Sequence, residues 1–271
     1  MRIRRPVVAG KFYPADEKKL KGEVDGWLGE NSTNTKAAWA VMLPHAGYIY
    51  CGDVIGRTLG GVALPSRLII LCPNHTGYGT ALSVWTEGAW LTPLGLVNAD
   101  REIAEDLVNS GTGFAADESA HLGEHSIEVL LPFLQEQTKD LSIVPVCVGT
   151  QNPAFLAKAG QGLADVLKRH VNCGIIISSD MNHYEDERTT IKKDEEALER
   201  AVAADPDGLL NIVKKDGISM CGAAPLALAL YAARDLGGVR VELVAHTTSG
   251  RVSGDFDHTV GYAGLRLYLD A

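Results

Sequence analysis

Short apolar runs alternate with longer amphipathic segments along the chain, and this pattern predicts its secondary structure. The runs AVML at 40–43, LIILC at 68–72 and GIIIS at 174–178 are apolar at consecutive positions, as in strands that helices cover on both faces. The predicted strands are 39–43, 67–72, 81–85, 141–148, 174–178, 239–247 and 259–268, and the predicted helices are 16–28, 51–59, 101–109, 124–137, 153–170, 187–203, 206–214 and 223–236. The alternation predicts a layered α/β fold with a mixed central sheet flanked by helices, in a single domain over residues 1–271.

Composition and charge narrow the classes of protein that fit this pattern. The chain has 271 residues and a net charge of -9, which disfavours binding to nucleic acid. No stretch approaches the roughly 20 apolar residues that span a bilayer, so we expect no membrane association. The basic N-terminus runs into Lys11 and Asp16 rather than a signal-peptide apolar core, which predicts a cytoplasmic protein.

The five cysteines are scattered and form no C-x-x-C pair, which argues against a disulfide framework. Cys72 and Cys147 lie within apolar runs and are predicted to be buried thiols. Cys221 directly precedes a predicted helix, whose dipole favours a thiolate. Cys221 is therefore a candidate ligand or nucleophile, and the alternative is a core cysteine packed under the helix.

Histidines follow three of the predicted core strands at the points where these strands end. His45 comes after the first strand, His75 after the second, and Asp180 with His183 after the run at 174–178. Ligands of open α/β sheets bind in the crevice outside the carboxyl ends of the strands, so these side chains are expected to converge there. The alternative is that each histidine simply caps a strand end.

The segment His121-Leu122-Gly123-Glu124-His125 matches the H-x-x-E-H pattern of inverted zinc metalloproteases. That pattern requires both histidines on one helical face. We expect the helix to begin near Glu124 instead, which leaves His121 in a loop, while His125 or Glu124 could still point into the crevice. Ser178-Ser179-Asp180 with His183 could suggest hydrolysis, but such residues usually cap the backbone.

Read together, these motifs resemble the Memo family, known in prokaryotes as AmmeMemoRadiSam system protein B. The matching residues are Arg5-Pro6 with Val8-Ala9-Gly10 and Phe12-Tyr13-Pro14, Pro44-His45-Ala46-Gly47-Tyr48 with Tyr50-Cys51-Gly52, Pro73-Asn74-His75, Thr92-Pro93-Leu94, Glu124-His125-Ser126-Ile127-Glu128, Leu131-Pro132-Phe133, Ser178-Ser179-Asp180 with His183, Cys221-Gly222, Thr248-Ser249-Gly250 and Val260-Gly261-Tyr262-Ala263. The resemblance implies a fold similar to that of class III extradiol dioxygenases, which hold non-haem Fe(II) with two histidines and a carboxylate.

Carried over by position, the resemblance implies that His45 and His75 are metal ligands and that Cys221 takes the place of the carboxylate. His183, with Asp180 beside it, would be an imidazole near the substrate, and His125 would line the same pocket. A thiolate is softer than a carboxylate, so this ligand set suits copper or zinc as well as iron.

From these observations we expect an iron- or copper-dependent redox activity, with a dioxygenase-like step on a small molecule. The rival hypothesis is a non-catalytic protein that keeps the metal pocket and docks a peptide or another partner. The resemblance also implies radical-SAM and AMMECR-type partner proteins.

Overall fold

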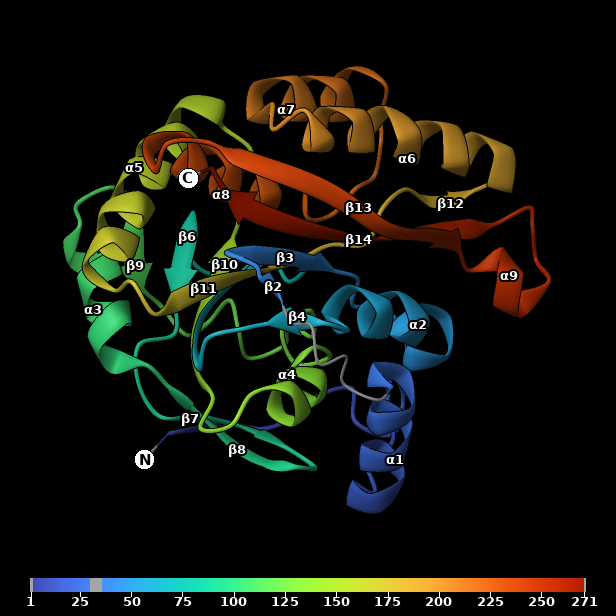
Figure 1. Cartoon of the computed structure of the whole chain (residues 1–271), viewed down its shortest axis with the longest axis horizontal. Helices are drawn as coiled ribbons and strands as arrows, with labels where there is room; N and C mark the ends of the chain where they lie inside the picture. The colour runs from blue at the N-terminus through green and yellow to red at the C-terminus, as the bar shows by residue number, and fades with distance from the viewer. Residues whose placement is uncertain (1, 30–35, 271) are drawn as a thin grey trace.

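The computed structural model describes residues 2–29 and 36–270, and its helices pack against both faces of one large mixed sheet (Figure 1). The helices are α1 (Glu17–Leu28), α2 (Tyr48–Leu59), α3 (Arg101–Asn109), α4 (Leu131–Gln137), α5 (Pro153–Arg169), α6 (Glu187–Val202), α7 (Pro206–Lys215), α8 (Ala223–Asp235) and α9 (Gly250–Ser253). This arrangement confirms the layered α/β fold that the alternating pattern predicts.

The strands range from two-residue edge pairings to long central strands. They are β1 (Ile3–Arg4), β2 (Lys36–Ala37), β3 (Ala40–Leu43), β4 (Val62–Ala63), β5 (Arg67–Pro73), β6 (Leu82–Val84), β7 (Ala89–Thr92), β8 (Gly95–Ala99), β9 (Phe114–Ala116), β10 (Ser142–Val148), β11 (Cys173–Ser178), β12 (His183–Glu185), β13 (Val239–Thr248) and β14 (Thr259–Leu269). All seven predicted strands are present, and no end is shifted by more than one residue.

The main path of the sheet runs β1-β7-β8-β10-β5-β11-β3-β14-β12. In its centre β10, β5, β11 and β3 are parallel, whereas β14 is antiparallel to β3 and carries β13 on its other side. β6 pairs with β10 and β9, and β2 pairs with β4 in a separate small ribbon. The parallel centre places the carboxyl ends of three consecutive neighbours, β5, β11 and β3, at one edge of the sheet.

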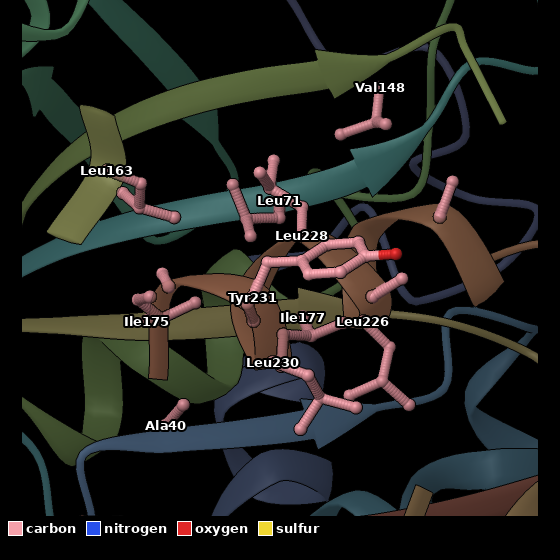
Figure 2. Close-up of a cluster of buried hydrophobic side chains, with 14 of the residues drawn as sticks. Ala40, Leu71, Val148, Leu163, Ile175, Ile177, Leu226, Leu228, Leu230 and Tyr231 are labelled. Atoms are coloured by element: carbon pink, nitrogen blue, oxygen red, sulfur yellow. The ribbon is translucent and has the colours of Figure 1, made fainter. Parts of the chain in front are cut away.

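Both faces of these strands are buried, which explains their continuous apolar sequence. Ile69 and Leu71 of β5 belong to the core under α3 and α5–α8, whereas Leu68 and Ile70 belong to the core under α1, α2 and α4. Figure 2 shows the first of these cores, where Leu226, Leu228 and Leu230 of α8 lie among side chains of the sheet. Residues 223–233 of α8 are all buried, and the turn that carries Cys221 directly precedes this helix.

Two differences from the predicted elements affect the site. The predicted helix 51–59 begins three residues earlier, at Tyr48. The helix predicted from Glu124 begins only at Leu131, where Pro132 occupies the first turn, so its predicted start is wrong. Among the described residues, no helix is both long enough and apolar enough to cross a membrane.

Candidate metal centre

The predicted site residues meet at the edge where β3, β5 and β11 end. His45, His75 and Asp180 each follow one of these strands, and they line a cavity of about 730 Å³ together with His125 and His183. The strands are neighbours in the order β5-β11-β3 and run parallel, so their carboxyl ends deliver these side chains to one place. The crevice predicted from the strand-end pattern is therefore present.

Three possible ligand atoms lie close together in this region. One donor atom each from His45, His75 and Cys221 lies within 4.8 Å of the other two. The Cys221 Sγ atom is 3.5 Å from His45 Nε2, although the two residues are 176 positions apart in the chain. The His45 and His75 rings meet edge to face with centroids 5.3 Å apart. Cys221 itself is not one of the residues that line the cavity, and lies behind His45.

A chain of hydrogen bonds fixes the tautomer of His45. The Ser178 hydroxyl donates to the carbonyl oxygen of Ser126 at 2.8 Å, so it accepts from His45 Nδ1 at 2.8 Å. The proton is therefore on Nδ1, and Nε2 keeps its lone pair. Burial, followed by the neighbouring His75 and His125, lowers the pKa of His45 far below its usual range. His45 is thus a neutral imidazole with a free Nε2 atom.

Glu124 performs the same orienting role for His75. Its carboxylate is fully buried and accepts the His75 backbone N–H at 2.7 Å and the His75 Nδ1–H at 2.9 Å. Burial favours the neutral acid, but the hydrogen bonds and charge of His75 outweigh burial and lower the pKa of Glu124 to about 2. Burial likewise opposes the His75 cation, yet Glu124 outweighs it and the pKa of His75 is raised. The Nε2 atom of His75 is left for the cavity.

His75, Glu124 and His125 form a second group of close donor atoms. In this group, however, Glu124 Oε1 also accepts from the backbone N–H and the hydroxyl of Ser126, at 3.0 and 2.8 Å. Both carboxylate oxygens are therefore engaged in orienting His75 and closing the turn. Sequence reasoning placed Glu124 at the crevice but missed this role, because only its contact with His75 shows it.

Cys221 lies in the turn before α8, held against the end of β11. The backbone N–H of Asp180 donates to Cys221 Sγ at 3.2 Å. Gly222 permits the close approach, since a Cβ atom there would lie 2.2 Å from Ser179 Cβ. In the metal-free chain, burial and then the charge of Asp180 raise the pKa of Cys221, and both oppose the helix-end effect that the sequence predicts. A thiolate at this position needs a cation beside it.

The remaining predicted residues occupy the cavity walls. Asp180 Oδ1 accepts the His45 backbone N–H at 2.8 Å, and burial raises the pKa of this carboxyl group. His125 stacks on His75, with ring centroids 5.1 Å apart, and burial lowers its pKa. His183 donates its backbone N–H to the Ser219 hydroxyl at 2.7 Å. All three side chains line the cavity, as the sequence predicts.

The H-x-x-E-H segment does not form a paired metal site. Residues 124–130 form tight turns, because the Glu124 and Glu128 side chains bond to backbone N–H groups rather than point outward from a helix. His121 is fully buried, binds the Ser83 carbonyl oxygen through Nε2 at 3.0 Å and lies edge-on to Trp85 and Trp90. His125 instead faces the cavity, so the two histidines are separated, as predicted.

Aromatic side chains form a part of the cavity that sequence reasoning did not assign. Phe12, Tyr50, Tyr184 and Tyr262 line it. Tyr184 is exposed and has a φ angle of 60°, which is uncommon for a bulky residue and is found at functional sites. Ser253, Asp255 and His258, in and after α9, complete the opposite wall. Phe12, Tyr50 and Tyr262 lie in motifs that carry the family resemblance, but the sequence assigns them no role, and the other residues come from segments that no motif marks.

Comparisons with known proteins identify the family of the chain and relatives that match it over nearly their whole length. The chain is 40% identical over 282 residues to a MEMO1 family protein of Thermotoga neapolitana, covering 98% of this chain and 99% of the relative. It is 39% identical over 276 residues to the MEMO1 family protein MK0963 of Methanopyrus kandleri, covering 97% and 98% of the two chains. A MEMO1 family protein of Pyrobaculum arsenaticum is 37% identical over 281 residues, covering 99% of this chain and 100% of the relative.

A solved structure shows the same fold at low sequence identity. The uncharacterized protein JW3007 from Escherichia coli K12 aligns with a TM-score of 0.58 and 14% identity, over 84% of this chain and 98% of that chain. This likeness supports the layered α/β fold that the sequence predicts. The family model for Memo-like proteins matches residues 4–266. The chain belongs to the Memo family.

Proposed function

We propose that the cavity at the ends of β3, β5 and β11 binds one metal ion through His45, His75 and Cys221. We further propose that iron or copper is this ion, with zinc as the redox-inactive alternative, and that the protein carries out a dioxygenase-like redox reaction on a small molecule. The observation that supports the proposal most is the close group of three donor atoms, all within 4.8 Å of one another. Ligands near 2.0–2.3 Å from one ion lie about 3–5 Å apart.

The donor chemistry fits a metal ion better than it fits a purely structural hydrogen-bond network. Ser178 holds Nδ1 of His45 and Glu124 holds Nδ1 of His75, so Nε2 is the atom of each ring that would bind a metal ion, which would displace any proton on His75 Nε2. Metal-binding histidines usually donate their other ring N–H to a carboxylate, carbonyl or hydroxyl in this way. The sulfur of Cys221 accepts an N–H bond, which also suits a thiolate. Two imidazoles and a thiolate suit copper, zinc and iron.

When bound, the metal would supply redox chemistry and open positions for a substrate and oxygen. The residues of the chain provide the surroundings for that chemistry. Asp180 fixes the backbone of His45, and the aromatic side chains of Phe12 and Tyr184 flank the opening of the cavity. His183 contributes a ring whose Nδ1 is bound to Ser219, so its Nε2 can accept a proton from a substrate hydroxyl group.

Metal binding is tested first, and independently of any activity. The purified chain is loaded anaerobically with Fe(II), Cu(I) or Zn(II), and the affinity is measured by competition with a chromogenic chelator. We expect one ion per chain and a loss of at least about tenfold in affinity in His45→Ala. His170→Ala is the matched control, since His170 binds Asp106 at the surface of α3 and α5, far from the cavity. A parent chain that binds no ion contradicts the proposal.

Activity is tested on the loaded protein by oxygen consumption with a panel of catechols and with small-molecule reductants. We expect consumption that requires the metal and decreases in His183→Ala, which keeps all three proposed ligands. A protein that binds metal but consumes no oxygen with any of these compounds would favour the rival hypothesis of a peptide- or partner-binding protein.

A further inference from the structure

The segments that carry His183 and Cys221 are joined by hydrogen bonds between the buried Asn182 and the exposed Ser219. Asn182 is fully buried, and its Oδ1 atom accepts both the backbone N–H and the hydroxyl of Ser219, each at 3.1 Å. Asn182 directly precedes His183, and Ser219 lies two residues before Cys221. The Asn182 side chain therefore links the segment that carries His183 to the turn that carries Cys221.

Ser219 extends this link to His183 through two further hydrogen bonds. Its hydroxyl oxygen accepts the His183 backbone N–H at 2.7 Å, while its carbonyl oxygen lies 3.0 Å from His183 Nδ1. A carbonyl oxygen can only accept, so the proton of the neutral ring must be on Nδ1. Because His183 lines the cavity, Nε2 is the ring nitrogen left to face it without a proton.

The network has a rigid base outside the cavity. The backbone N–H of Asn182 donates to Asp194 Oδ1 at 2.8 Å, and Asp194 Oδ2 accepts from His246 Nε2 at 2.7 Å. Asp194 is fully buried and packs so closely on Gly261 that a Cβ atom there would lie 1.8 Å from Asp194 Oδ2. The Asn182 amide nitrogen also donates to Glu185 Oε2 at 2.6 Å. The side-chain amide and backbone N–H of Asn182 are thus bound to Ser219, Glu185 and Asp194.

We infer that Asn182 and Ser219 are positioning residues that hold both the Cys221 sulfur beside His45 and the His183 ring in the cavity wall. This inference rests on the proposed function of the cavity as a metal site. Only Met220 separates Ser219 from Cys221, so a displacement of Ser219 moves the sulfur relative to His45. The same displacement removes the carbonyl acceptor that sets the tautomer of His183. A single substitution should therefore disturb two residues that do not touch each other.

The test compares Ser219→Ala with Ser219→Thr, which keeps the hydroxyl, and with Ser253→Ala as the matched control. Ser253 also lines the cavity, but its hydroxyl donates to the Ser249 carbonyl oxygen and accepts the Asp255 backbone N–H, both at 3.1 Å, and so bonds within its own segment. Co(II) serves as the probe, because a thiolate ligand gives it a strong near-ultraviolet absorption. The tautomer of His183 is read from the ¹⁵N shifts of its ring in the metal-free protein, assigned by comparison with His183→Ala.

We expect Ser219→Ala to lose about 10- to 100-fold in Co(II) affinity, to weaken the sulfur absorption and to lose the single Nδ1–H tautomer of His183. Ser219→Thr should restore both signals, and Ser253→Ala should leave both unchanged. If Ser219→Ala keeps the parental affinity, absorption and tautomer, the inference is overturned.

Failure of the proposed function gives a different result. A parent chain that binds no Co(II) contradicts the metal site, while the tautomer measurement still tests the network without any metal. If Ser219→Ala fails to fold, the parent alone decides: a proton on His183 Nε2 overturns the inference, and a proton on Nδ1 supports it.

Discussion

Replacing Glu128 by glutamine removes one buried charge and leaves the shape of the side chain almost unchanged. Glu128 and its ion-pair partner Arg4 are both buried, with 0% and 1% of their side chains exposed. The Glu128 carboxylate also accepts the backbone N–H groups of Val7 and Val8 and the hydroxyl of Tyr13, at 2.8–3.0 Å. The substitution therefore tests what this carboxylate contributes to the N-terminal segment and to the turns that carry His125.

The expected loss of stability depends on the hydrogen-bond partners that a glutamine at position 128 cannot satisfy. An amide has one acceptor oxygen, so either Arg4 or the group of Val8 N–H and Tyr13 O–H faces an NH₂ group instead. Arg4 would keep only its bonds to the carbonyl oxygens of His121 and Glu124. Removing one partner of a buried ion pair costs about 3–5 kcal/mol. At about 2 °C per kcal/mol for a chain of this length, the melting temperature should fall by about 6–10 °C.

The assay is urea unfolding at neutral pH, followed by circular dichroism and by tryptophan fluorescence. Glu105→Gln is the control, because Glu105 forms an exposed ion pair with Arg101 that should contribute less than about 1 kcal/mol. The double substitution Arg4→Leu with Glu128→Leu should recover part of the loss, since it leaves no unpaired buried charge. A loss below about 1 kcal/mol in Glu128→Gln would refute the reasoning, because that is the range of an exposed pair.

Three further predictions concern the proposed thiolate ligand, the buried His121 and the turn before α8. Cys221→Ser should lower the affinity for Cu(I) at least about tenfold in chelator competition, with little change in melting temperature. Cys72→Ser should bind Cu(I) normally and lose about 1–3 kcal/mol of unfolding free energy, because a hydroxyl enters an apolar strand. If Cys221→Ser binds Cu(I) as the parent does, Cys221 is not a ligand. Burial lowers the pKa of His121 from 6.5 to about 4, so the unfolded chain binds the proton more readily between these values. The stability due to neutral His121 is therefore present above pH 6.5 and is lost as the pH falls toward 4, by about 3 kcal/mol in all. We measure the free energy of unfolding in urea for the parent and His121→Gln across pH 4–7. The difference between the two should change by about 3 kcal/mol between pH 7 and pH 4, and a difference that does not depend on pH would contradict the assignment. Gly222→Ala should destabilise the chain and weaken metal binding, because the new Cβ atom would clash with Ser179. Gly22→Ala is the control: in α1 its Cβ atom meets nothing within 4 Å, so it should stabilise the chain by about 0.5–1 kcal/mol. Equal melting temperatures for the two variants would contradict the predicted clash.

The sequence alone predicts the centre of the fold and most of the cavity. The strands β3, β5 and β11 are evident because they are apolar at every position, and His45, His75 and Asp180 follow from the rule that parallel strands end at one edge. Cys221 was proposed from the turn before α8 and from the family resemblance. The bound metal, the redox activity, the partner proteins and the single-domain organisation stay predictions.

The sequence does not predict the turns at 121–130, because the interactions that form them are distant in the chain. The run IEVLLPFL has a helical pattern, yet Glu124 binds His75, 49 residues earlier, and Glu128 binds Arg4, 124 residues earlier. These contacts outweigh local helix propensity. Edge strands such as β1, β4 and β12 are missed for a similar reason, since they have only two or three residues and depend on their partners.

The separation of the site residues along the chain has a consequence for how the protein folds. His45 and Cys221 are 176 residues apart, and they meet only when β3, β11 and the turn before α8 are all in place. Contacts of such long range form late and make folding slow. An ion held by His45, His75 and Cys221 would bind the native chain but not partly folded chains in which these side chains are still apart. It would then stabilise the native state by mass action, by about 2.7 kcal/mol when its free concentration is 100 times the dissociation constant. The concentration of free metal in the surroundings would thus set the fraction of molecules that are folded.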